Sequence, residues 1–197
     1  LILYDGRFTA TALQGIEKLN HLESFHLKFC REIEALPQNI GMLSSLRCLY
    51  IEHAPCLRTF HSLVFRLQNL QELTLEECTG LGTREGKVGL LDDLTALANL
   101  RILRIAKAPN LEKLPDLGVL SQLDTLELHS IGLKSLQLSN NYSIQTLKLT
   151  YLSLETLNLT GVRCVEDLSL EGCRDLVSLQ VTRKEQCEKP LLFVDLI

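Results

Sequence analysis

The sequence lacks several features that mark common functional classes. It has no tryptophan, and aromatic residues are only 5% of its 197 residues, so it offers no run of rings on which nucleic-acid bases would stack. Its formal net charge of −4 has the wrong sign for a nucleic-acid footprint. No apolar run reaches the ~18 residues of a membrane span, and no signal-peptide pattern opens the sequence. We therefore expect no nucleic-acid partner and no membrane partner.

Motifs for catalysis, cofactors and metals are also missing. The phosphate-binding pattern GxxxxGK[ST] does not occur, and the five histidines have no metal-ligand spacing with one another or with cysteine. The seven cysteines are odd in number and have no paired spacing, which predicts reduced thiols in a cytoplasmic protein. Two Asn-x-Ser/Thr sequons, at Asn141 and Asn158, point to secretion instead, but we attribute them to chance. The expectation is a protein that is not an enzyme, with no catalytic residue, no metal and no cofactor.

Leucine, by contrast, is abundant and recurs in a fixed phrase. The pattern apolar-x-x-apolar-x-apolar occurs six times between Leu123 and Val181, with its second apolar position at residues 126, 136, 147, 157, 168 and 179. Two apolar residues separated by one polar residue have the period of a β-strand. Upstream, strand-like pairs begin at residues 1, 25, 49, 73, 103 and 126, in steps of 24, 24, 24, 30 and 23. Such intervals predict a repeat architecture.

The longer steps, together with the phrase LxxLxL, resemble leucine-rich repeats. This resemblance implies an α/β leucine-rich-repeat solenoid, or horseshoe, with a parallel sheet on the concave face and short helical, 3₁₀ or loop returns. In that family the third residue after the apolar pair is Asn or Cys and is buried where the chain turns out of the strand. The corresponding positions here are Cys30, Ala54, Cys78, Ala108, Ile131, Asn141, Leu152, Val162 and Cys173.

The short steps of 10 and 11 residues predict a second sheet. A coil this short cannot enclose a core two side chains thick, whereas two short steps together equal one ordinary coil. We therefore predict that the strands at Leu126, Leu147 and Leu168 continue the main sheet. The strands at Leu136, Leu157 and Leu179 would then form a second sheet on the opposite wall.

The domain organisation expected is one solenoid over residues 1–197, with repeats of 23–30 residues over 1–122 and short-step repeats over 123–181. Residues 182–197 are predicted to be a charged loop and a final strand. Neither end carries a polar capping repeat, so we expect a fragment of a larger chain.

The segments between strands predict short helices and one insertion. Residues 9–22, 63–70 and 90–100 have apolar residues at helical spacing, whereas Pro37 favours an extended or 3₁₀ path. Residues 79–89 are predicted to form a loop that bulges from one edge, either to contact a partner or simply as a tolerated surface loop.

Two kinds of phrase carry a closer resemblance. Leu36–Ile51 (LPQNIGMLSSLRCLYI) resembles the repeats of plant intracellular nucleotide-binding leucine-rich-repeat (NLR) disease-resistance proteins, as do the LxLxxCxxL phrases Leu73–Leu81 and Leu168–Leu176. The resemblance implies a sensor domain that binds a pathogen effector or a host protein. It also implies a possible contact with a nucleotide-binding domain outside this chain. The 10–11 residue steps depart from that family and are similar to the two-strand coils of some bacterial surface repeats.

The residues between the inward leucines are predicted to face outward in a row suited to a protein partner. That row is Ile2, His26, Tyr50, Thr74, Arg104, Glu127, Lys148 and Ser169. Tyr50 with Phe29 and Arg47 is the expected anchor cluster, because Tyr and Arg are frequent in binding hot spots. The candidate protein-binding residues on the concave face are His26, Phe29, Arg47, Tyr50, Glu52, Arg104 and Glu127.

Two other interaction roles fit the same repeats. One is the substrate-recruiting repeat of an F-box ubiquitin ligase, and the other is a bacterial secreted or surface repeat protein. The residues that precede Leu1 in the parent protein would distinguish them.

Overall fold

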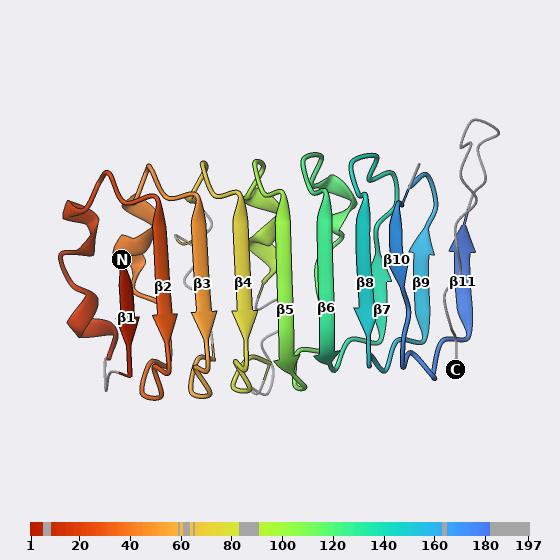
Figure 1. The fold of residues 1–197 in the computed structure, drawn as a ribbon, viewed down its shortest axis with the longest axis horizontal. Coiled ribbons are helices and arrows are strands. Elements are labelled where there is room, and N and C mark those ends of the chain that lie inside the picture. Colours follow the sequence, from red (N-terminus) through yellow and green to blue (C-terminus); the bar gives the residue numbers. More distant parts are fainter. Residues whose placement is uncertain are drawn as a thin grey trace.

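A computed structural model describes residues 1–5, 9–58, 60, 64, 66–82, 91–162 and 165–181. The described chain forms a leucine-rich-repeat solenoid in which each coil contributes one strand to a parallel sheet (Figure 1). The eight strands lie in the order β1-β2-β3-β4-β5-β6-β8-β10. Their bounds are β1 Ile2–Tyr4, β2 Ser24–Lys28, β3 Cys48–Glu52, β4 Glu72–Glu76, β5 Ile102–Ala108, β6 Thr125–Ile131, β8 Thr146–Thr150 and β10 Asp167–Ser169.

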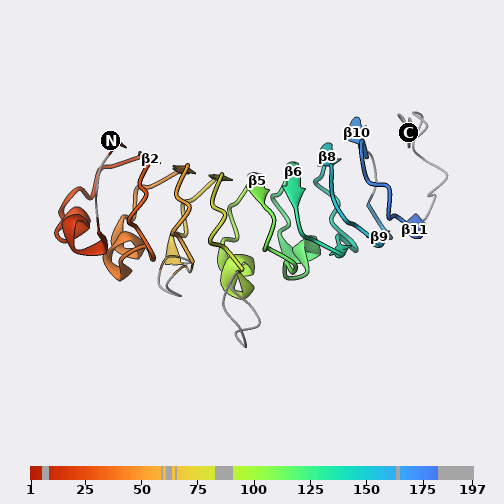
Figure 2. The same ribbon diagram turned by 90° about the horizontal axis from the view of Figure 1, so that it is seen from below.

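The C-terminal coils contain a second parallel sheet. It consists of β7 (Ser135–Gln137), β9 (Thr156–Leu159) and β11 (Ser178–Val181), in the order β11-β9-β7. Figure 2 shows β9 and β11 on the wall opposite β8 and β10. Consecutive strands therefore alternate between the two walls, which confirms the prediction made from the 10–11 residue steps.

Short 3₁₀ helices lie in the returns, in keeping with the predicted helical, 3₁₀ or loop returns. They are η1 (Ala10–Leu13), η2 (Ile16–Lys18), η3 (Gln38–Met42), η5 (Asp92–Ala96) and η6 (Leu117–Val119). Within the described part of the chain, no helix is both long enough and apolar enough to cross a membrane. Pro37 is extended, with φ −70° and ψ 150°, as predicted.

The spacing of the buried leucines explains why these returns are 3₁₀. The inward residues recur at every third position, as at Ile40, Leu43 and Leu46, and each is at most 1% exposed. A 3₁₀ helix places residues i and i+3 on the same side, so such a row stays on the core. The i+3 hydrogen bonds follow this period, with Leu43 N bonded to Ile40 O at 3.0 Å and Leu46 N to Leu43 O at 3.0 Å.

Four predictions fall wholly or partly outside the described residues. Residues 63 and 65 of the predicted helical segment 63–70, residues 83–89 of the predicted 79–89 loop and residue 90 of the predicted helical segment 90–100 are among them. Residues 182–197, predicted as a charged loop and a final strand, lie entirely outside.

The core is one continuous row of leucines between the walls. Phe25, Leu49, Leu73 and Leu103 are buried side by side in the main sheet, each 0–1% exposed. All nine predicted anchor positions are buried as well. Asn141, 0% exposed, is the buried polar side chain among the described residues. Its Nδ2 donates to Leu120 O at 3.0 Å, and its Oδ1 accepts from Ser143 N at 3.0 Å.

Each coil of the main sheet turns at a residue with left-handed backbone conformation, two positions after its last inward residue. In order, these are Asp5, Phe29, His53, Glu77, Lys107, Ser130, Tyr151 and Gly172, with φ between 48° and 71°. The turn is held by the next coil, since Phe29 N donates to Glu52 O at 2.9 Å and His53 N to Glu76 O at 2.8 Å. The turn residues therefore form a regular row along one edge of the sheet.

Candidate protein-binding face

The outer surface of the main sheet is the inner side of a shallow arc (Figure 2). We define the concave face as the four outward positions of each coil: one before, one between and one after the two inward residues, and the turn residue. The central row is Ile2, His26, Tyr50, Thr74, Arg104, Glu127, Lys148 and Ser169, aligned by the strand register. This is the row that the sequence predicted.

Five rings gather at the N-terminal end of this face, and we call them the ring cluster. His26 and Tyr50 stack with their centroids 4.2 Å apart. Phe29 lies 5.2 Å from the ring of Tyr4 and 5.0 Å from that of His53. Tyr4 is 65% exposed and the other four are half-buried. The cluster is an ordered amphipathic surface on a rigid sheet, which suits binding of a partner.

A chain of hydrogen bonds and ion pairs continues from the ring cluster across the rest of the face. Tyr50 Oη donates to Glu72 Oε2 at 2.6 Å, and Arg104 Nη1 lies 2.5 Å from Glu72 Oε1. Arg104 Nε donates to Glu127 Oε2 at 2.8 Å. Lys148 Nζ lies 3.7 Å from Glu127 Oε1 and 3.2 Å from an oxygen of Asp167. The chain thus crosses from β3 to β10.

The sign of charge alternates from strand to strand between β4 and β10. The segments 71–77, 124–131 and 166–172 contain acidic residues and no Lys or Arg, whereas 101–108 and 145–151 contain basic residues and no Asp or Glu. Adjacent strands lie ~4.8 Å apart, so each cation has a carboxylate beside it. Opposite charges on neighbouring strands stabilise the order of the coils.

A second group of contacts lies along the row of turn residues. His53 Nδ1 and Lys107 Nζ each lie 2.6 Å from an oxygen of Glu77. The hydrogen bond from Lys107 is the main cause of the lowered pKa of Glu77, and the contact with His53 lowers it further. The same bond raises the pKa of Lys107. Both groups are therefore held in their charged forms at neutral pH.

Two polar atoms in the central row are buried without a hydrogen-bond partner: His26 Nδ1 and Thr74 Oγ1. The other ring nitrogen of His26, Nε2, lies 2.9 Å from Ser24 Oγ. Burial is the main cause that lowers the pKa of His26, with the nearby charge of Lys28 second. Burial also raises the pKa of Tyr50, whose hydroxyl remains a donor to Glu72. His26 is therefore neutral at pH 7.

The structure separates Arg47 from the other two residues of the expected anchor cluster. Tyr50 lies at the centre of its strand against His26, whereas Phe29 lies in the row of turn residues against His53. Arg47 is exposed just before β3 begins, six positions before His53. Six residues of strand span ~20 Å, so Arg47 lies just outside the concave face, at the edge opposite Phe29. Arg47 is therefore not part of one cluster with Phe29, whereas Tyr50 and Phe29 both belong to the ring cluster.

The other predicted residues lie within the face. Arg104 and Glu127 bind each other, and Glu52 is paired with Lys28 at 2.9 Å. Sequence reasoning missed Glu72, which links Tyr50 to Arg104. Glu72 directly precedes an inward leucine, and the period of two places that position outward as well, so the signal was present.

The described residues offer no arrangement that resembles a catalytic centre. Ser24 Oγ contacts His26, but no group orients the imidazole through Nδ1, as a nucleophilic triad would require. Burial raises the pKa of the Cys30 and Cys173 thiols, and that of Cys78 to about 12, so these thiols are not nucleophiles at neutral pH. No group of three or more His, Cys, Asp or Glu side chains in this part of the chain could hold a metal ion.

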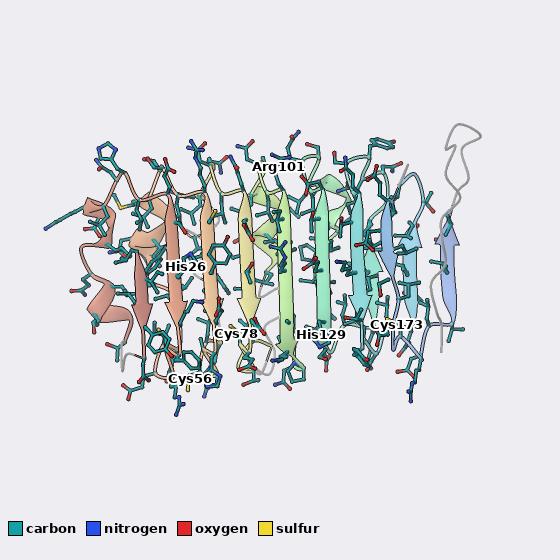
Figure 3. All side chains as sticks on the ribbon, viewed as in Figure 1. His26, Cys56, Cys78, Arg101, His129 and Cys173 are labelled. Atoms are coloured by element: carbon teal, nitrogen blue, oxygen red, sulfur yellow. The ribbon has the colours of Figure 1, made fainter. Side chains whose placement is uncertain are left out.

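A shallow polar depression lies where β4 to β10 begin. It has a volume of about 650 Å³ and is lined by side chains that include Arg101, Asp124, Tyr142 and Glu166. Arg101 and Asp124 already bind each other at 3.1 Å, and Arg101 lies at this edge of the sheet (Figure 3). Among its lining residues only Tyr142 and Ile144 are apolar or aromatic, so the depression lacks the apolar walls that bury small-molecule ligands.

No protein-family model and no curated protein match this chain. The solved structures that are similar to it include the following three. A leucine-rich-repeat protein of Leptospira interrogans is 19% identical, with a TM-score of 0.47, over 85% of this chain and 56% of its own. The leucine-rich-repeat domain of the type III effector XopL is 24% identical, with a TM-score of 0.48, over 84% of this chain and 63% of its own. The functional domain of InlJ from Listeria monocytogenes is 15% identical, with a TM-score of 0.37, over 92% of this chain and 52% of its own. The chain thus spans less than two thirds of each of these proteins.

Proposed function

We propose that the protein is a binding module that holds a protein partner on the concave face. The observation that carries this proposal is the ring cluster, five rings ordered by ring contacts on a rigid parallel sheet. Tyr and Phe side chains supply large contact areas at low entropic cost, and they are enriched in interface cores.

The size of the face supports a protein rather than a small ligand. Eight strands at ~4.8 Å and six residues per coil at ~3.3 Å give a surface of ~38 Å by ~20 Å. That is about 760 Å², close to the ~800 Å² that each partner contributes to a standard interface. Regular hydrogen-bonded strands hold these side chains in place, so binding requires little ordering of the module.

We further propose that the parent protein is a cytoplasmic immune receptor of the plant nucleotide-binding leucine-rich-repeat type. The repeat phrases at Leu36–Ile51 and Leu73–Leu81 support this proposal. The free thiols of Cys30, Cys78 and Cys173, buried in separate coils, are consistent with a reducing compartment. A bacterial surface or secreted repeat protein is the second candidate, favoured by the two-strand coils. The parent reading frame upstream of Leu1 would distinguish a phosphate loop, a signal peptide and an F-box.

A site-specific crosslinking experiment tests the binding role. A photoreactive amino acid is placed at Thr74 in the central row and, as a matched control, at Asn158 on the second sheet. In an extract of the source organism, we expect the Thr74 probe to form a discrete protein adduct that disappears when Tyr50→Ala is added. The Asn158 probe should form no such adduct.

Adducts of equal yield from both probes, or an adduct unaffected by Tyr50→Ala, would show that the concave face is not the protein-binding surface. Circular dichroism of each variant would verify that the solenoid is intact.

A further inference from the structure

The net charge of the chain is concentrated on the concave face. The four outward positions of each coil contain four of the chain's 20 Lys and Arg residues, Lys28, Arg104, Lys107 and Lys148. They contain eight of its 24 acids: Asp5, Glu52, Glu72, Glu76, Glu77, Glu127, Asp167 and Glu171. The face therefore has a net charge of −4, equal to that of the whole chain. The remaining 16 basic and 16 acidic residues cancel.

All four cations of the face are already held by carboxylates. Lys28 pairs with Glu52, and Lys107 with Glu76 and Glu77. Arg104 and Lys148 share Glu127, and each also binds a second acid. An anionic partner would have to break these pairs. A cationic partner would instead find carboxylates with capacity left, because the side chains of Glu52, Glu76 and Glu77 are 32–45% exposed.

These carboxylates lie beside the ring cluster. Glu72 on β4 accepts from the hydroxyl of Tyr50 on β3, and Glu77 contacts His53 in the same way. A ring and a carboxylate on adjacent strands suit a guanidinium group, which stacks on the ring and forms hydrogen bonds to the carboxylate in its own plane. An ammonium group has neither the planar face nor the forked geometry.

We infer that the partner presents a cationic segment to the concave face, with arginine side chains stacked on the ring cluster and paired with the carboxylates of β3 and β4. This inference rests on the proposed binding role and assigns the chemistry of the partner. Charge complementarity of this kind mainly sets specificity and association rate, so the interaction should weaken as salt is added.

Defined peptides test this inference on the whole protein. The probes are three fluorescent peptides of equal length in which serine alternates with arginine, lysine or glutamate. By fluorescence anisotropy, we expect saturable binding of the arginine peptide and weaker binding of the lysine peptide. We expect no detectable binding of the glutamate peptide. Raising the salt from about 0.05 M to about 0.3 M should weaken binding of the arginine peptide several-fold.

Two matched variants locate the binding. The triple variant Glu52→Gln, Glu76→Gln and Glu77→Gln should weaken the arginine peptide by about tenfold, as expected for three exposed charge pairs. The triple variant Glu112→Gln, Glu155→Gln and Asp175→Asn changes the net charge equally at exposed positions off the face, and should leave the affinity unchanged. Tyr50→Leu should reduce the preference for arginine over lysine.

Equal weakening by both triple variants, or no saturable arginine binding at millimolar peptide, would overturn the inference. The crosslinking experiment remains separate: a Tyr50-dependent adduct with a partner that lacks a basic segment would contradict the cationic partner and leave the binding role intact. If the peptides bind as expected but no Tyr50-dependent adduct forms, the binding role would fail while the cation preference stands.

Discussion

At the scale of the residue, the close stacking of coils leaves some backbone positions no room for a side chain. A Cβ added to Gly132 would lie 2.1 Å from Pro109 O, a backbone atom of the preceding coil. Gly15 differs, since a Cβ there would meet nothing within 4 Å, although its φ of 87° is left-handed. Gly132 therefore tests the effect of a steric clash, and Gly15 tests the effect of a left-handed backbone conformation alone.

We expect Gly132→Ala to lower the free energy of unfolding by about 2–3 kcal/mol, because coil separation must increase locally. Gly15→Ala should cost only about 1 kcal/mol, the penalty for an L-residue in that conformation. Urea unfolding followed by circular dichroism measures both. Equal effects of the two substitutions would contradict the close approach at Gly132.

His26 predicts a dependence of stability on pH. Its pKa in the folded protein is lowered by burial, by Lys28 and by the N-terminal amino group, while Ser24, Tyr50, Glu52 and Glu72 are its other polar and charged neighbours. The unfolded chain therefore binds a proton first as pH falls below the usual value of about 6.5, and folding stability decreases there.

The drop in melting temperature between about pH 7.5 and about pH 5.5 should be smaller in His26→Gln than in the unmodified protein. His21→Gln, at an exposed histidine of the first return, is the matched control and should retain the full drop. An unchanged drop in His26→Gln would show that another group titrates.

At the scale of the element, each coil depends on the residue that anchors its turn. Asn141 forms four hydrogen bonds to backbone groups: Nδ2 to the carbonyls of Leu117 and Leu120, and Oδ1 to the N–H groups of Ser143 and Ile144. Cys78, at the equivalent position, has only long thiol contacts to carbonyls, at 3.6 and 3.8 Å. At the same position of the coil, the Asn amide therefore forms stronger hydrogen bonds to the backbone than the Cys thiol does.

Asn141→Ala should reduce the free energy of unfolding by about 3 kcal/mol or more, because buried backbone groups lose their partners. Cys78→Ala should cost about 1 kcal/mol, mainly through a small cavity. Chemical denaturation of the two variants provides the comparison, and an equal loss would mean that the amide bonds do not matter. The full burial of Asn141 also excludes that sequon from glycosylation in the folded protein.

Much of the element structure could be predicted from the sequence, for a physical reason. The strand period of two and the alternation of long and short steps determine which residues can face a shared core, so both sheets and the central row were found. The helix type was left open, because an i, i+3 spacing such as Ile40, Leu43 and Leu46 is common to both helix types. The turn residues were missed because Phe29, His53 and Lys107 carry no glycine signal. Their conformation is imposed by hydrogen bonds from the next coil.

At the scale of the whole molecule, the strands of the described residues pair only with strands of neighbouring coils. Each main-sheet strand pairs with the strands beside it, and the second sheet spans only the C-terminal coils (Figure 1). Stability in such a solenoid is approximately a sum of coil terms and nearest-neighbour terms. Damage should therefore spread along the axis over a limited distance.

Leu157→Ala, at a side chain 1% exposed in β9, should cost about 2–5 kcal/mol. Amide hydrogen exchange should accelerate in β7 to β11 and remain nearly unchanged in β2 and β3. Leu49→Ala in β3 is the reciprocal control, with fast exchange expected at the opposite end. Uniform acceleration in either variant would show that the molecule unfolds as one cooperative unit.

The alternation of charge from β4 to β10 also limits how the molecule can grow or shrink by whole repeats. Loss of the single coil that carries β6 would place Arg104 beside Lys148, two like charges on adjacent strands. Loss of two coils, those of β6 and β8, would bring the basic strand β5 against the acidic strand β10 and keep every neighbour opposite in sign. A parity rule follows: deletions and duplications in this half of the array are tolerated in even numbers, and an odd change requires a compensating reversal of charge.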